Sequence, residues 1–157
     1  MQVFILMTKK EQLVYKNFDD GKFDFNKLSL FLDKHNLQTK ISSNYLNDFI
    51  LQSVYQVKGV QHTSDFNSIY QKLEQEFNPT HKKSDLDIFF SMVSGSSSIT
   101  HVDSYRVYIL NLVGKIVYKL DTGLFELNTG DLLIIPLGTT HKAMGLTPRI
   151  TLSYALY

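Results

Sequence analysis

The chain contains no cysteine and no tryptophan, and its 16 basic residues nearly balance its 15 acidic ones. Without cysteine it can form no disulfide, thiolate zinc site, iron–sulfur cluster or cysteine nucleophile, so imidazole and carboxylate groups must hold any bound metal. The net charge of +1 among 157 residues argues against a nucleic-acid partner, because domains that bind nucleic acid through a charged face usually carry a clear basic excess.

Long apolar stretches are also scarce near the start of the chain. Residues 3–7 form an apolar run of only five, with no basic region before it and no small-residue cleavage site after it. We therefore expect no membrane association and a cytoplasmic location. A chain of this length buries about two thirds of its unfolded surface, which is enough for one stable domain without cross-links.

The composition changes near Asn78-Pro79, since residues 85–157 contain six of the eight glycines. In the first half, apolar residues recur at helical spacing, which predicts three amphipathic helices with Ser43 and Ser64 as caps. We expect residues 1–84 to form a helical cover that belongs to the same domain as the second half. The apolar positions of the three helices are Leu28, Phe31 and Leu32; Tyr45, Leu46, Phe49 and Ile50; and Phe66, Ile69, Tyr70, Leu73 and Phe77.

The second half is rich in short runs of Ile, Val, Leu, Tyr and Phe, separated by Gly, Ser, Asn or Asp. Closely spaced short strands of this kind favour a β-sandwich or a closed jelly-roll barrel over a parallel sheet with helical crossovers. We predict a mainly β fold with α additions, whose strands lie near residues 86–93, 105–113, 115–121, 123–127, 130–135, 139–144 and 149–157.

Three residues of this half could bind a metal together. His101 and Asp103 lie two positions apart, so an extended backbone places both side chains on the same face. His141 follows a predicted strand and a Pro/Gly turn that would carry it back toward them. Two imidazoles and one carboxylate form the facial triad of non-haem Fe(II) oxygenases, which leaves coordination positions open for a co-substrate and oxygen.

The spacing of these residues resembles the two motifs of the cupin superfamily. Gly95 precedes His101 by five intervening residues, with Asp103 two positions on, and Gly114 closes the first motif. The second motif, Gly, five residues, Pro-x-Gly, two residues, His, is matched by Gly130, Pro136, Gly138 and His141, and fifteen residues separate Gly114 from Gly130. The resemblance implies a double-stranded β-helix over residues 85–157.

The details are similar to the JmjC-like branch of that superfamily. Val107 stands where many cupins have a metal-binding Glu, Gly145 stands where many have Asn, and Asp103 replaces the usual second His. JmjC-like hydroxylases bind Fe(II) through His-x-Asp and a distant His. The resemblance therefore implies Fe(II), replaceable by Mn, Ni or Zn, with 2-oxoglutarate and oxygen as co-substrates.

A basic side chain must hold the far carboxylate of 2-oxoglutarate. JmjC-like relatives place it two positions after the glycine matched by Gly114, where this sequence has Ile116. Lys115 is adjacent, but strand alternation turns it to the other face unless a bulge intervenes, which favours a solvated hairpin lysine. Arg149 is the second candidate, with Thr151 on the same face, although a surface or capping role is open for it. Tyr108, Asn111 and Tyr118 are further candidate hydrogen-bond donors, with core or edge positions as the alternative.

These features predict an oxygenase that hydroxylates a protein side chain or a small molecule. Two alternatives stay open: a metal-dependent cupin dioxygenase or isomerase that does not use 2-oxoglutarate, and a non-catalytic binding module. The resemblance also implies a homodimer. The compact length is similar to that of small cupins encoded by bacteriophages, for which the location would be the host cytoplasm. Asp85 and Asp87, which precede the first predicted strand, are expected to be solvated at its edge.

Overall fold

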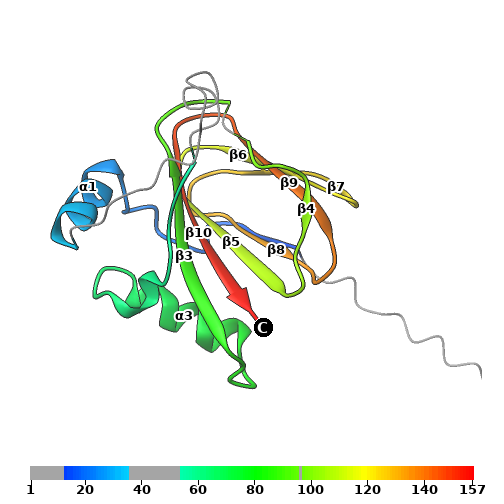
Figure 1. Cartoon of the computed structure of the whole chain (residues 1–157), viewed down its shortest axis with the longest axis horizontal. Coiled ribbons are helices and arrows are strands. Elements are labelled where there is room, and N and C mark those ends of the chain that lie inside the picture. The colour runs from blue at the N-terminus through cyan, green and yellow to red at the C-terminus, as the bar shows by residue number, and fades with distance from the viewer. Residues whose placement is uncertain (1–12, 36–53, 96) are drawn as a thin grey trace, which may run out of the picture.

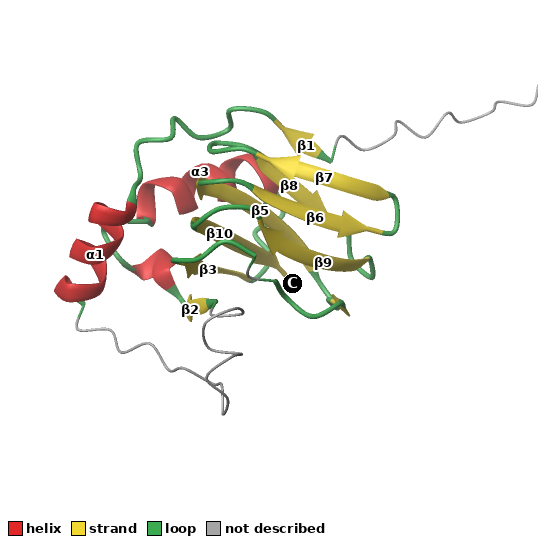
Figure 2. Cartoon of the chain, turned by 90° about the horizontal axis from the view of Figure 1, so that it is seen from above, coloured by secondary structure: helices red, strands yellow, loops and turns green. Residues whose placement is uncertain are grey.

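The computed structural model describes residues 13–35, 54–95 and 97–157. The described chain is mostly β, with two antiparallel sheets and helices packed on one side (Figures 1 and 2). The six-stranded sheet has the order β1 (Val14–Tyr15), β8 (Leu132–Ile135), β5 (Arg106–Val113), β10 (Arg149–Leu156), β3 (Ser84–Ser91) and β2 (Tyr55–Val57). The four-stranded sheet has the order β4 (His101–Val102), β9 (Thr140–Gly145), β6 (Ile116–Leu120) and β7 (Gly123–Leu127).

The six-stranded sheet is buried on both faces because its central strands alternate between two environments. Along β10, Ile150, Leu152 and Tyr154 contribute to the core on the helical side, while Arg149 and Thr151 face the space between the two sheets. The neighbouring β5 follows the same alternation, as strands with a side-chain period of two must. The prediction that Arg149 and Thr151 share one face of their strand is therefore confirmed.

Within the described residues, two helices and one short 3-10 helix cover the face of the six-stranded sheet that is turned away from β6, β7 and β9 (Figures 1 and 2). They are α1 (Phe25–Lys34), η1 (Val60–His62) and α3 (Asn67–Phe77). Their buried side chains, including Phe31, Phe66 and Leu73, join the core formed by β3, β5 and β10. None of the described helices is long and apolar enough to cross a membrane.

The expected helix caps differ from the observed ones. Asp24 caps α1 by accepting a hydrogen bond of 2.8 Å from the Lys27 amide. Ser64 does not cap α3, because that helix begins at Asn67 after a backbone N-cap at Phe66, and the Ser64 hydroxyl instead contacts Asp65 at 3.5 Å. The second expected helix, around residues 45–50, lies outside the described residues, as does Ser43.

The first half also contributes strands, which the sequence did not indicate. Strand β1 pairs with β8, and β2 pairs with β3, so residues before position 84 form both edges of the six-stranded sheet. These strands have two and three residues, too short to show an alternating pattern. The seven strands predicted in the second half are all present. Their ends differ by up to two residues, since β3 spans Ser84–Ser91 rather than 86–93 and β8 begins at Leu132 rather than at 130. The two-residue β4 was not predicted.

Candidate metal centre

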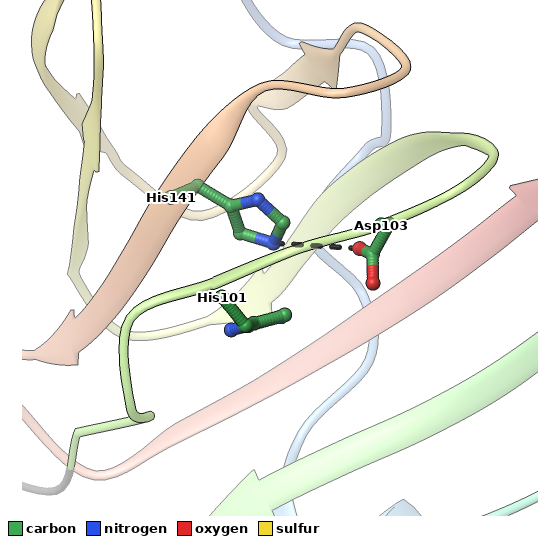
Figure 3. A group of neighbouring side chains, drawn as sticks. All are labelled: His101, Asp103 and His141. Carbon is green, nitrogen blue, oxygen red and sulfur yellow. Dashed lines mark ion pairs between the residues drawn. The ribbon is translucent and has the colours of Figure 1, made fainter.

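The side chains of His101, Asp103 and His141 lie close together (Figure 3). His101 on β4 lies directly opposite His141 on β9 in the antiparallel register, and their ring centroids are 4.2 Å apart. Asp103 follows β4 immediately, and its Oδ2 lies 3.5 Å from His141 Nε2. One ligand atom from each of the three residues lies within 4.8 Å of the others.

Each imidazole is oriented by a backbone carbonyl two residues earlier in the chain. His101 Nδ1 lies 2.8 Å from the Ile99 carbonyl oxygen, and His141 Nδ1 lies 3.0 Å from that of Thr139. A carbonyl accepts only, so each Nδ1 donates, and in the neutral imidazole the lone pair is then on Nε2. Outer hydrogen bonds of this kind are what fixes the tautomer of metal-ligating histidines.

The donor set fits a divalent metal ion. A metal bound about 2.1 Å from each of two neighbouring ligands holds those ligands about 3 Å apart, close to the 3.5 Å between His141 Nε2 and Asp103 Oδ2. Two nitrogens and one oxygen suit Fe(II) and similar ions. His101, Asp103 and His141 could therefore hold one metal ion, with positions left for other ligands.

The turn between β8 and β9 connects two of these residues. Gly138 has a φ of 76°, a left-handed conformation that favours glycine, and its amide donates a 3.1 Å hydrogen bond to the Asp103 carbonyl oxygen. In the same turn, the Thr139 amide bonds to the Pro136 carbonyl oxygen at 3.1 Å, and the Thr139 carbonyl orients His141. The Pro-x-Gly sequence thus fixes the backbone on which Asp103 and His141 converge.

A cavity of about 660 Å³ lies between the sheets and includes all three residues in its lining. Its wall also contains the apolar side chains of Val107, Ile109 and Ala143 and the guanidinium-bearing side chain of Arg149. Because β5, β9 and β10 all supply inward-facing positions, residues far apart in the sequence share this one space.

Arg149 is a buried cation with an incomplete set of partners. Only 3% of its surface is exposed, and its Nε has no hydrogen-bond partner in the described part of the chain. Burial lowers the pKa of the guanidinium, partly offset by the Tyr118 side chain beside it. The Tyr118 hydroxyl is itself buried, which raises its pKa to about 12, so Tyr118 stays a neutral donor at physiological pH.

The other candidate side chains divide between the cavity and elsewhere. Thr151 lines the cavity, and its hydroxyl lies 3.5 Å from the Phe89 carbonyl oxygen. Lys115 does not line it: its Nζ lies 3.9 Å from Glu126 Oε1, and both side chains are more than half exposed. This is the solvated hairpin position that strand alternation predicts.

Two further candidates do not reach the cavity either. The Asn111 side-chain amide donates to the carbonyl oxygens of Gly114 at 2.7 Å and Leu127 at 3.3 Å, so it joins β5 to neighbouring backbone. Tyr108 points to the helical side of β5, where it stacks on Phe77 with ring centroids 4.6 Å apart. Strand alternation explains the position of Tyr108, whereas backbone hydrogen bonds hold the side chain of Asn111.

Sequence reasoning placed Asp85 and Asp87 wrongly at a solvated strand edge. Both line the cavity, because they occupy the inward-facing positions of β3. Asp87 accepts hydrogen bonds from Gln56 Nε2 at 2.8 Å and the Gly59 amide at 2.9 Å. The alternation of Asp85 and Asp87 with the buried Leu86 and Ile88 was the available signal.

The fold and the geometry together define a mostly β protein of two antiparallel sheets with a candidate metal centre. Structures of YcfD, a ribosomal oxygenase from Escherichia coli, share this fold. The complex with cobalt and 2-oxoglutarate has a TM-score of 0.70 and 20% identity, covering 92% of this chain and 47% of that chain. The complex with cobalt and succinic acid has a TM-score of 0.68 and 19% identity, covering 92% and 47%.

KdgF from Halomonas sp. is also similar, with a TM-score of 0.54 and 13% identity, covering 78% of this chain and 89% of that chain. No family model matches the chain, and no curated protein matches it. The chain spans about half the length of the YcfD chains. At these identities the similarity establishes the fold, and it supports the resemblance to the JmjC-like cupins at that level.

Proposed function

We propose that the protein is an Fe(II)- and 2-oxoglutarate-dependent oxygenase on a cupin double-stranded β-helix, with His101, Asp103 and His141 as the metal ligands. The observation that carries the proposal is the presence of Arg149 in the same cavity as these residues. One wall of the cavity thus offers a divalent-metal site, and another offers a buried cation.

Burying a guanidinium without an anionic partner is costly. No carboxylate among the described residues forms an ion pair with Arg149, and its Nε is unsatisfied. A carboxylate from a bound molecule would neutralise the charge of Arg149 and accept a hydrogen bond from its Nε. The planar guanidinium suits a carboxylate because it can donate two parallel hydrogen bonds to it. A dicarboxylate such as 2-oxoglutarate could reach the metal with one end and Arg149 with the other.

The roles of the chain's own residues follow from this arrangement. When bound, Fe(II) would supply the open coordination positions at which 2-oxoglutarate and oxygen react. The backbone carbonyls of Ile99 and Thr139 hold the imidazoles with Nε2 toward the metal position. Arg149 orients the far carboxylate of 2-oxoglutarate, and Tyr118 and Thr151 lie in the same cavity to support Arg149. The apolar side chains of the cavity wall limit the access of water to the metal site.

The neighbouring YcfD structures contain cobalt with 2-oxoglutarate or succinic acid, which supports the proposed ligands for this chain. The primary substrate is proposed as a protein side chain or a small molecule. The homodimer, the cytoplasmic location and the phage origin stay predictions from the resemblance.

Binding of 2-oxoglutarate tests the proposal. In a calorimetric titration of the Mn(II)-loaded protein, we expect saturable binding that Arg149→Gln weakens about 10- to 100-fold, because a charged hydrogen-bonded pair is lost. Lys115→Gln is the matched control, since it removes a neighbouring cation outside the cavity, and it should change affinity less than twofold.

If Arg149→Gln fails to fold, Tyr118→Phe can replace it, because it removes one hydroxyl and keeps nearly the shape of the wild-type side chain. It should weaken 2-oxoglutarate binding a few-fold. Release of succinate with Fe(II) and oxygen would separate this function from that of a cupin enzyme that does not use 2-oxoglutarate. An absence of 2-oxoglutarate binding to the metal-loaded wild type would refute the proposed co-substrate.

A further inference from the structure

A carboxylate outside the cavity lining is linked to His141 through a single peptide group. Asp121 Oδ2 accepts a 3.1 Å hydrogen bond from the Thr140 amide. The carbonyl oxygen of the preceding residue, Thr139, lies 3.0 Å from His141 Nδ1. The Thr139 carbonyl and the Thr140 amide belong to the same planar peptide unit, so the three groups form one hydrogen-bonded chain.

We propose that Asp121 is a positioning residue for the metal centre, which acts on His141 through the Thr139–Thr140 peptide. The inference rests on the proposed role of His141 as a metal ligand. Metal-ligating histidines commonly donate their second ring N–H to a carboxylate or a carbonyl, which fixes the tautomer and raises the basicity of the ligand nitrogen. Here a carbonyl is the direct acceptor, and a carboxylate lies behind it.

The physical basis is the polarisability of the peptide group. A hydrogen bond at the peptide N–H increases the electron density on its carbonyl oxygen, so each bond of such a chain strengthens the next. An anionic acceptor at Thr140 therefore makes the Thr139 oxygen a better acceptor for Nδ1–H. The result is a stronger preference for the tautomer that leaves Nε2 free.

The fold makes this link specific to one of the two histidines. Leu120 at the end of β6 lies opposite His141 in the sheet register, so the next residue, Asp121, reaches the Thr139–Thr140 peptide. The Ile99 carbonyl oxygen plays the same direct role for His101. In the described ranges, however, no side chain accepts a hydrogen bond from the Thr100 amide. His101 therefore serves as an internal reference.

The test compares Asp121→Ala and Asp121→Asn with Glu126→Gln, which removes an exposed carboxylate from β7 of the same sheet. Titration with Co(II), followed by its visible absorption, measures metal affinity. We expect Asp121→Ala to weaken Co(II) binding about 10-fold. Asp121→Asn keeps an acceptor oxygen without the charge and should lie between Asp121→Ala and the wild type, while Glu126→Gln should match the wild type.

A second measurement does not depend on metal binding. In the metal-free protein, nitrogen-15 NMR of the imidazoles reports which ring nitrogen carries the proton. We expect Asp121→Ala to increase the fraction of His141 protonated at Nε2 and to leave His101 unchanged. If wild-type protein binds no Co(II), the proposed metal centre fails, while this measurement still tests the link.

Two outcomes would overturn the inference. One is Asp121→Ala behaving like Glu126→Gln in both measurements. The other is a loss of Co(II) affinity in Asp121→Ala with an unchanged tautomer distribution at His141, because the effect would then arise without the peptide link.

Discussion

Neutralising Glu74 should weaken the attachment of helix α3 to the sheet that carries Arg149. The Glu74 carboxylate accepts hydrogen bonds from the hydroxyls of Tyr154 and Ser84 and from Asn78 Nδ2 at 3.0 Å. Tyr154 is fully buried on β10, and Ser84 begins β3. One carboxylate thus joins the helix to two strands that form the cavity wall.

The charge of Glu74 matters for these bonds. Partial burial raises the pKa of the Glu74 carboxyl, but hydrogen bonds from Ser84, Tyr154, Asn78 and Tyr70 together outweigh it and lower the pKa below its ordinary value of 4.5. A group whose pKa is lower in the folded state stabilises the fold above its unfolded pKa, and it loses that effect as the pH falls through its folded pKa.

Glu74→Gln keeps the shape of the side chain and removes its charge. Hydrogen bonds to a charged group contribute roughly 1.5–3 kcal/mol each, against about 0.5–1.5 kcal/mol for neutral ones. Weakening the two hydroxyl bonds in this way should lower the free energy of unfolding by about 2 kcal/mol. With a urea dependence of roughly 2 kcal/mol per molar, the midpoint falls by about 1 M.

Urea denaturation followed by far-UV circular dichroism measures this loss, and Glu76→Gln on the exposed side of the same helix is the matched control. At pH 7 the Glu74→Gln midpoint should lie well below that of Glu76→Gln. The difference should shrink as the pH is lowered below about 4.5. Equal midpoints for the two variants at pH 7, or a difference unchanged at low pH, would refute the reasoning.

Two further predictions concern the turn at Gly114 and the metal centre. Gly114 has a φ of 82°, and an added Cβ would overlap the Pro148 carbonyl oxygen and lie 2.5 Å from Thr147 Oγ1, so Gly114→Ala should cost about 2–5 kcal/mol of stability. Gly95 has a similar φ of 78° but open space around its Cβ position, so Gly95→Ala should cost only about 1–2 kcal/mol, and equal thermal shifts would contradict the overlap. Asp103→Ala should weaken Co(II) binding at least about 100-fold, whereas Asp87→Asn, a carboxylate change in the same cavity, should leave it within about twofold. Similar losses in both variants would show that cavity charge, rather than ligation, holds the metal.

Much of the second half could be predicted because its strands are long and alternate. Arg149 and Thr151 are separated by the apolar Ile150, so their shared face follows from the period of two. The motif spacing similarly indicated that His101, Asp103 and His141 meet, since two strand ends and one turn control their positions. In this half, the alternation and the motif spacing of the sequence therefore predict the same arrangement that the folded chain adopts.

Other features depend on contacts that no local pattern reveals. The two-residue β1 exists because β8 offers it a partner, and β2 likewise depends on β3. Parity placed Lys115 away from the interior, but only the assembled barrel shows that Arg149 shares a cavity with the histidines. Asp121 was missed for the same reason, since its link to His141 passes through the backbone of another strand.

The central claim is that one cavity binds a metal ion and a dicarboxylate at the same time. Anaerobic addition of 2-oxoglutarate to the Fe(II)-loaded protein tests it directly, because chelation of Fe(II) by a 2-oxo acid produces a visible charge-transfer absorption. We predict a saturable band that Asp103→Ala abolishes and that Arg149→Gln shifts to higher 2-oxoglutarate concentration. No band in the wild-type protein, or equal 2-oxoglutarate affinity with and without metal, would contradict the account.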